Sequence, residues 1–172
     1  RDTANIMTDL PGWPVGATAN SVKAFKNFLL AIGYNDGSAS YPDRLVWSDA
    51  ADPGTLPTEW TATATNLAGD LSFGDTPGGL VDGATLRGNF VLYKTGATYL
   101  LHFLPGNNAV LSKRLLFATS GILARNCVAE VEGKHIVLTD SDVIMHDGQT
   151  VKSIVDTRAR RELFASMDAD NY

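Results

Sequence analysis

The chain has 172 residues, of which 44% are hydrophobic and 19% charged, and its formal net charge is −5. These values are typical of a folded protein with one substantial hydrophobic core or two very small ones, and they differ from those of a disordered chain. The net negative charge argues against a nucleic-acid-binding surface, which would be basic. No run approaches the roughly eighteen apolar residues of a membrane span, and the single cysteine excludes an internal disulfide framework or a cysteine-rich zinc site.

The first part of the chain is predicted to form an irregular arm followed by a hairpin. Pro11 and Pro14 interrupt residues 1–20, which contain no charged segment followed by an apolar run and so predict no signal peptide. The next run, SVKAFKNFLLAIGY at residues 21–34, fits neither the helical nor the strand period cleanly. The NDG turn after it and the β-like run RLVWSD at residues 44–49 favour two strands of a hairpin.

Two loop-rich intervals lie before the middle of the chain. Residues 50–69 are rich in Pro, Gly and Thr and are predicted to form a long surface loop, a feature that is often functional. The sequence GDTPGGLVDGATLRGN at residues 74–89 is predicted to be a second loop-rich interval. The run FVLYKTGATYLLHF at residues 90–103 then has two apolar segments that flank a KTG turn, and it predicts a hairpin.

Residues 128–154 consist of four short runs rich in Val, Ile and Leu, separated by turn residues. The separators are EG at 132–133, DSD at 140–142 and DG at 147–148. Runs of this length between such turns predict a four-stranded antiparallel meander of tight hairpins.

The last part of the chain, residues 155–172, is predicted to be a short amphipathic helix and a tail. Asp156 is the expected N-cap residue. The basic cluster of Arg158, Arg160 and Arg161 is predicted to be a solvated helix face or a surface that pairs with another subunit, with phosphate contact as the alternative. The apolar residues that recur at helical spacing are Val155, Ala159, Leu163, Phe164 and Met167.

Three stretches of the chain share one form, an apolar run, a polar turn and a second apolar run. They begin near Phe28, Phe90 and His135, so their spacings are 62 and 45 residues. The second spacing suits a propeller blade of about 40–45 residues, and the first suits a blade with an inserted loop. We therefore expect a mainly β fold of antiparallel meanders, a partial or complete β-propeller at residues 21–154, with a short C-terminal helix. A sandwich of the sheets is the alternative.

The sequence contains no set of residues that predicts catalysis or metal binding. His102, His135 and His146 each lie in or at the end of a predicted strand, and two of them are placed to approach one another on neighbouring strands of the meander. Such histidines are more often packed or hydrogen-bonded than metal-bound, and Cys127 is predicted to be a buried, inert thiol. Calcium-loop, phosphate-loop and nucleophile-elbow patterns are missing, so we expect no enzymatic activity, cofactor or metal.

Five segments between residues 9 and 171 carry a resemblance to virion proteins of tailed bacteriophages. Their most specific parts are the WSDAADPG turn and the pair formed by GILARNCV and HDG. The segments are DLPGWPVGATANSVKAFKNFLLAIGY, YPDRLVWSDAADPGTLPTEW, DTPGGLVDGATLRGNFVLYKTGATYLL, SGILARNCVAEVEGKHIVLTDSDVIMHDGQTVKSI and TRARRELFASMDADN. The chain thus resembles head-completion and tail-nozzle proteins of short-tailed phages.

That resemblance implies a non-enzymatic structural subunit that contains a β-propeller. It implies a ring of about six copies below the portal and adaptor, assembled in the host cytoplasm and forming the channel through which DNA leaves the virion. DNA would pass without specific binding, and a net acidic wall suits such passage because it repels phosphate. Members of this family are several hundred residues long, so the 172-residue chain departs from the family pattern and corresponds either to a domain of such a protein or to a part of a longer chain.

Subunit contacts are expected at the two loops and at the arginine cluster. The loops are at residues 50–69 and 74–83, and the first of them contributes Asp52 and Trp60. The helix contributes Arg158, Arg160 and Arg161. The alternative function is a carbohydrate-binding or sialidase-like propeller of a receptor-binding tail protein. Trp13, Trp47 and Trp60 would then supply aromatic platforms, although Trp47 lies in a predicted strand.

Overall fold

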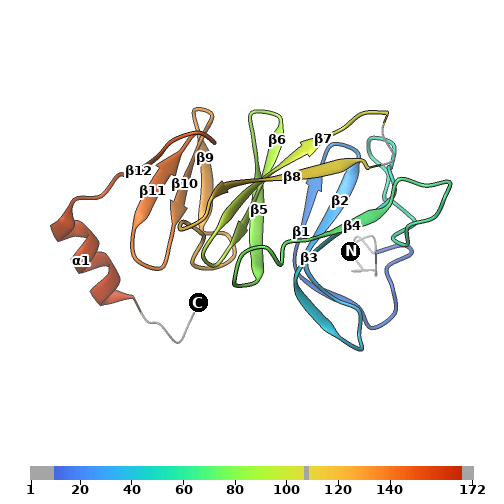
Figure 1. Cartoon of the computed structure of the whole chain (residues 1–172), viewed down its shortest axis with the longest axis horizontal. Coiled ribbons are helices and arrows are strands. Elements are labelled where there is room, and N and C mark those ends of the chain that lie inside the picture. The colour runs from blue at the N-terminus through green and yellow to red at the C-terminus, as the bar shows by residue number, and fades with distance from the viewer. Residues whose placement is uncertain (1–9, 107–108, 168–172) are drawn as a thin grey trace, which may run out of the picture.

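A computed structural model describes residues 10–106 and 109–167 of the chain. Within these residues the protein has three antiparallel sheets of four strands and one helix, arranged in chain order along the molecule (Figure 1). Each sheet is a meander, because every strand pairs with the next one in sequence. The strands are β1 Thr18–Phe25, β2 Phe28–Asn35, β3 Ser40–Trp47, β4 Gly69–Ser72, β5 Leu80–Leu86, β6 Asn89–Lys94, β7 Thr98–Phe103, β8 Leu111–Phe117, β9 Val128–Val131, β10 Lys134–Leu138, β11 Val143–His146 and β12 Val151–Ser153, and helix α1 is Thr157–Ser166.

The first sheet, β1–β4, contains the predicted hairpin as β2 and β3, but the run at residues 21–34 forms two strands, β1 and β2, where one strand was expected. β1 and β2 pair from Thr18 opposite Asn35 to Phe25 opposite Phe28, so both strands reach their shared turn. The turn places Lys26 at φ 53°, in the left-handed region. The ambiguous period of this segment has a simple cause: β2 is buried on both faces, and a strand of that kind does not alternate between apolar and polar residues.

The second sheet, β5–β8, corrects the sequence interpretation of residues 74–89. We expected a loop there, whereas Leu80–Leu86 is strand β5. Its Gly83 read as a loop residue, but a Cβ at this position would lie 2.3 Å from Cε1 of Phe90. Glycine is therefore needed so that the Phe90 ring can lie against the strand. The predicted hairpin at residues 90–103 is confirmed as β6 and β7.

The third sheet, β9–β12, confirms the predicted meander over residues 128–154. All three predicted turns are present, with Glu132 and Gly133 both at positive φ and Gly148 at φ 88°. The Asp147 carboxylate accepts hydrogen bonds from the N–H groups of Gln149 and Thr150, which closes the last turn. The helix is also confirmed, and its N-cap Asp156 accepts from the Ala159 N–H at 2.8 Å.

The second sheet is the middle layer of the stack, and its two faces pack on the other two sheets. β5 contacts β1, β2 and β3 on one side and β9 on the other, so the first strands of the three sheets are neighbours (Figure 1). The first junction, between the first and second sheets, is built from large side chains that include Phe25, Phe28, Leu30, Ile32, Trp47, Phe73, Phe90, Leu92, Tyr99 and Leu101. The second junction, between the second and third sheets, is smaller and contains Leu86, Val91, Tyr93, Leu100, Ile122, Val137 and Ile144.

The repeat predicted from the sequence corresponds to the second strand of each sheet. Phe28 begins β2, and Phe90 and His135 are the second residues of β6 and β10. Over the described residues the three sheets form an open series and no closed ring. Within the same residues no helix is long and apolar enough to cross a membrane.

Candidate functional site

Over the described residues, no other sheet packs on the outer face of the third sheet. His135 and Val137 of β10 are buried toward the second sheet, so the alternating residues Ile136 and Leu138 point the opposite way. Val131 is 48% exposed, and none of these outward residues belongs to a hydrophobic core of the described chain. The open face, as we call it, has two lysines, Lys134 and Lys152, at its margin, and its apolar residues are Val131, Ile136, Leu138, Val143 and Met145.

The outer face of the first sheet, at the other end of the stack, is covered. Trp60 from the β3–β4 connection is only 4% exposed and packs on the same core as Tyr34. The Trp13 ring lies edge-on to Trp60 with centroids 4.6 Å apart, and its Nε1–H donates to the Ala17 carbonyl. Trp60 therefore holds its loop on the sheet and does not present its ring to solvent.

Helix α1 touches the rest of the protein mainly through one charged side chain. Arg160 lies 3.5 Å from the Asp142 carboxylate, whereas Arg158 pairs within the helix with Glu162. Arg161 is exposed and has no ion pair among the residues that the structure describes. No residue of α1 is buried, and Leu163 is 38% exposed. A helix with an unburied apolar side has little stabilisation of its own, so we expect it to pack on something else.

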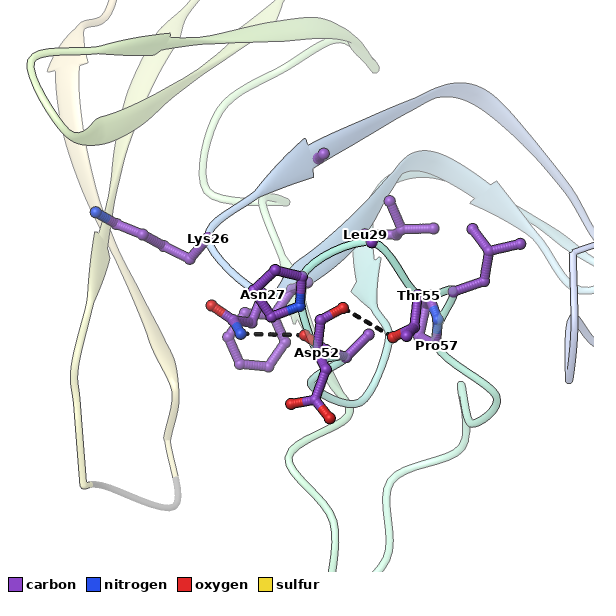
Figure 2. Close-up of a pocket in the computed structure, with 12 residues that line it drawn as sticks. Lys26, Asn27, Leu29, Asp52, Thr55 and Pro57 are labelled. Atoms are coloured by element: carbon purple, nitrogen blue, oxygen red, sulfur yellow. Dashed lines mark hydrogen bonds between the residues drawn. The ribbon is translucent and has the colours of Figure 1, made fainter.

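The β3–β4 connection holds an open pocket of about 260 Å³ between its Asp52–Pro57 segment and the β1–β2 turn (Figure 2). The pocket is shaped by two hydrogen bonds from side chains to backbone carbonyls, in which Asn27 Nδ2 donates to the Ala51 carbonyl and the Thr55 hydroxyl donates to the Asp52 carbonyl. Figure 2 shows the Asp52 carboxylate and the Lys26 ammonium pointing away from each other. Leu56, also in the lining, is 54% exposed.

The connection and the helix carry opposite charges and lie at opposite ends of the molecule (Figure 1). Residues 48–69 contain Asp49, Asp52 and Glu59 and no Lys or Arg, whereas α1 contains three arginines and one glutamate. The sequence analysis selected residues from both ends as subunit contacts, and the structure does not bring them together within one chain.

A buried carboxylate joins all three sheets near their first strands. Asp82 of β5 is fully buried, and its Oδ1 accepts from the Ser21 hydroxyl at 2.8 Å and lies 3.1 Å from Lys23 Nζ. Its Oδ2 accepts from the Asn126 N–H, in the segment that leads to β9. Burial raises the pKa of this carboxyl, but these hydrogen bonds outweigh it, and the pKa lies below its usual value.

Two of the three histidines meet in the second junction, as expected for neighbouring strands. His135 and His146 are cross-strand partners, and both bind the hydroxyl of Tyr93 from β6. The sequence analysis missed Tyr93 and Asp82, because their partners lie far away in the sequence. Cys127 is half-buried and not fully buried as expected.

The Asp82 contacts and the cluster of Tyr93, His135 and His146 hold the sheets in place. Among the described residues, neither pairs a nucleophile with a base at an accessible surface. Both histidines of the second junction are closed off from solvent, at 0% and 1% exposure. Among the described residues, no group of three or more His, Cys, Asp or Glu side chains is placed to hold a metal ion. The accessible features are instead the open face, the basic helix and the acidic connection.

No protein-family model matches the chain, and no curated protein matches it either.

Proposed function

We propose that this protein is a non-enzymatic structural subunit of a phage virion, one copy in a ring that forms the tail nozzle or the head-to-tail connector. The sequence resemblance supplies the identity of the particle. The observation that supports an assembly role is the open face, an apolar sheet surface that a stable monomer would cover. Neighbouring apolar residues that stay partly exposed on one sheet face favour a role in protein–protein contact.

In this proposal the three sheets are blades of a β-propeller. Each is a four-stranded meander, their first strands are neighbours, and they stack face to face. Closed propellers have about four to eight blades, so three blades need further sheets from the same polypeptide or from a neighbouring subunit. The half-buried outward residues of the third sheet, such as Ile136 and Met145, are where the next layer would pack.

The contact between subunits is head to tail. The basic helix and the open face form one end of the subunit, and the acidic connection with Asp52 and exposed Leu56 forms the other. Two different surfaces that complement one another make a heterologous contact, which closes into a ring when the rotation between copies permits it. Among the described residues, Arg158 and Arg160 have carboxylate partners and Arg161 has none, so Arg161 is the arginine of α1 that we expect to pair with a neighbouring subunit.

A carbohydrate-binding propeller is less well supported by the tryptophans. Trp47 and Trp60 are 5% and 4% exposed, and Trp13 lies against Trp60, so their rings are not arranged as open platforms for a sugar.

The test is the native mass of the particle and its dependence on the two charged ends. We expect the wild type to form rings visible by electron microscopy, and Arg161→Glu to lose them while circular dichroism and the melting temperature stay unchanged. Arg114→Glu, an exposed arginine on the second sheet, is the matched control and should assemble normally. A second variant, Asp52→Lys, should restore assembly when mixed with Arg161→Glu.

Two results would reject the proposal. One is a wild type that stays monomeric at high protein concentration in physiological salt. The other is tight DNA binding, measured by fluorescence anisotropy, that Arg161→Glu abolishes.

A further inference from the structure

The buried cluster of Tyr93, His135 and His146 has a fixed direction of hydrogen bonding. His135 Nε2 lies 2.9 Å from the Thr85 carbonyl oxygen, which can only accept, so Nε2 carries the proton. In a neutral imidazole Nδ1 is then an acceptor, and it accepts a hydrogen bond from the Tyr93 hydroxyl at 2.7 Å. The Tyr93 oxygen in turn accepts from His146 Nε2 at 2.6 Å. With both imidazoles neutral, this chain of hydrogen bonds places the proton of each on Nε2.

The remaining nitrogen of His146 makes the cluster sensitive to acid. Its Nδ1 is buried and has no hydrogen-bond partner in the described part of the chain, which a neutral lone pair tolerates. A proton added there would be a buried N–H without an acceptor, next to a second imidazole whose ring centroid is 5.4 Å away. A proton on His135 Nδ1 would face the Tyr93 hydroxyl and leave the hydroxyl hydrogen without an acceptor. Either protonation breaks the chain of bonds that joins the sheets.

We propose that Tyr93, His135 and His146 form a latch that holds the third sheet on the second while both imidazoles are neutral and releases it on acidification. The latch crosses the boundary between the two sheets, because Tyr93 and Thr85 belong to the second sheet and both histidines to the third. The core it closes is the smaller of the two junctions. This inference stands apart from the proposed function, since it concerns contacts within one chain.

The charges around the latch do not remove this sensitivity. Burial lowers the pKa of His135, which the Thr85 carbonyl and Glu130 of β9 partly oppose. Burial and the neighbouring His135 lower the pKa of His146 to about 4, against an opposing effect of Asp147. Asp147 stays ionised throughout, because the N–H groups of Thr150 and Gln149 lower its pKa to about 2.

The second sheet adds neutral groups to the latch. It faces the histidines with the Tyr93 hydroxyl, whose pKa burial raises, with the Thr85 carbonyl and with the Phe117 ring, 5.3 Å from His146. Arg87 of the β5–β6 turn lies against Gly133 at the end of the third sheet. The proton balance is therefore set by the two imidazoles.

The size and direction of the effect follow from linkage. A histidine whose folded pKa is lowered contributes its full stability above its unfolded pKa of about 6.5 and loses it as the pH falls. With a folded pKa of about 4 for His146, the equilibrium for docking the third sheet should fall about 30-fold between pH 7.5 and pH 5. Its acid limit is about 300-fold. Protonation of His135 acts in the same direction.

Hydrogen exchange on the whole chain, read by mass spectrometry from pH 7.5 to pH 4.5, tests the proposal once the intrinsic pH dependence of exchange is corrected. We expect residues 128–154 to lose protection below about pH 6 while β1–β7 keep theirs. His146→Phe, which has similar volume and cannot be protonated, should keep the third sheet protected at pH 5. His102→Phe is the matched control, because His102 is only half-buried, and it should behave as the wild type does.

A second readout does not depend on the folding of any variant. Nitrogen-15 chemical shifts of the wild type at pH 6 should show His135 and His146 neutral with the proton on Nε2. The proposal is overturned if His146 is protonated at that pH in a docked third sheet. It is equally overturned if all three sheets lose protection in one step, or if none does down to pH 4.5.

Discussion

The two junctions of the stack differ in the charge of their buried titratable groups, which are ionised at the first junction and neutral at the second. The first junction combines aromatic pairs, such as Phe73 and Tyr99 with centroids 4.9 Å apart, with the ionised Asp82 carboxylate beside it. The second has a smaller apolar core and two neutral imidazoles around a tyrosine hydroxyl. A buried carboxylate that accepts hydrogen bonds is stable until it is protonated, whereas a buried neutral imidazole is stable until it gains a proton.

This difference predicts the order in which acid acts on the molecule. Asp82 has a lowered pKa, so its contribution is present above its unfolded pKa of about 3.9 and is lost only below it. His146 loses its contribution between about pH 6.5 and pH 4, and the lowered pKa of His135 acts in the same direction. The junctions thus differ in size and in the pH at which each weakens. Variants of their polar residues measure the stability and the acid sensitivity of each junction separately.

Replacing Asp82 should have the largest effect. In Asp82→Ala the Ser21 hydroxyl and the Asn126 N–H lose their acceptor and Lys23 loses its partner, so we expect the free energy of unfolding to fall by about 3 kcal/mol. Urea denaturation at pH 7 measures it. The control is Asp70→Ala, which breaks an exposed pair with Arg44 and should cost less than about 1 kcal/mol. Equal losses in the two variants would show that the Asp82 contacts contribute no more than a surface pair.

Asp82 also shows where prediction from sequence ends. The turn residues and run lengths were enough to predict the third sheet, the hairpin of β6 and β7, the helix with its N-cap and the threefold repeat. Strand β5 was missed because it contains Asp82 and Gly83, two residue types that are rare in buried strands. Each is explained by a residue distant in sequence or on another strand, the first by Ser21 and the second by the Phe90 ring.

The candidate site was predictable to a similar extent. The pairing of His135 with His146 followed from the turns between their strands, but the bridging Tyr93 comes from 42 residues before His135. Long-range pairing of this kind has no signal in a single sequence. Trp60, chosen as a contact residue from its place in a long loop, is buried by Trp13 of the arm. The closure of the propeller stays a prediction, as do the particle and its partners.

Removing one hydroxyl should weaken the second junction more than the first. Tyr93→Phe leaves His135 Nδ1 and His146 Nε2 without their buried partner, and we expect a loss of about 2 kcal/mol. Tyr99→Phe is the matched variant in the first junction, where the hydroxyl bonds to Thr76 at a partly buried site and also interacts with the Asp75 carboxylate, and it should cost about 1 kcal/mol or less.

Hydrogen exchange shows which sheet loses stability in each of the two variants. Tyr93→Phe should lower protection in residues 128–154 at neutral pH, and Tyr99→Phe should leave that segment unchanged. A uniform loss over all three sheets in Tyr93→Phe would mean that the two junctions open as one unit.

The smallest effect is expected at the edge of the second junction, in the turn between β11 and β12. Gly148 has φ 88°, a conformation that valine adopts only with strain, and a Cβ there would lie 3.5 Å from Cδ2 of Leu86 in the second-junction core. The space is sufficient, so the cost comes from the backbone, and Gly148→Val should lower the free energy of unfolding by slightly more than 1 kcal/mol. Gly96→Val is the control, since Gly96 has open space and no positive φ, and it should change stability by less than about 0.5 kcal/mol. If the turn strain acts on the second junction alone, Gly148→Val should also raise the pH at which residues 128–154 lose protection, while the acid transition of the first junction stays where it is in the wild type. If Gly148→Val leaves the free energy of unfolding unchanged, the turn accommodates valine without strain and without weakening the neighbouring latch.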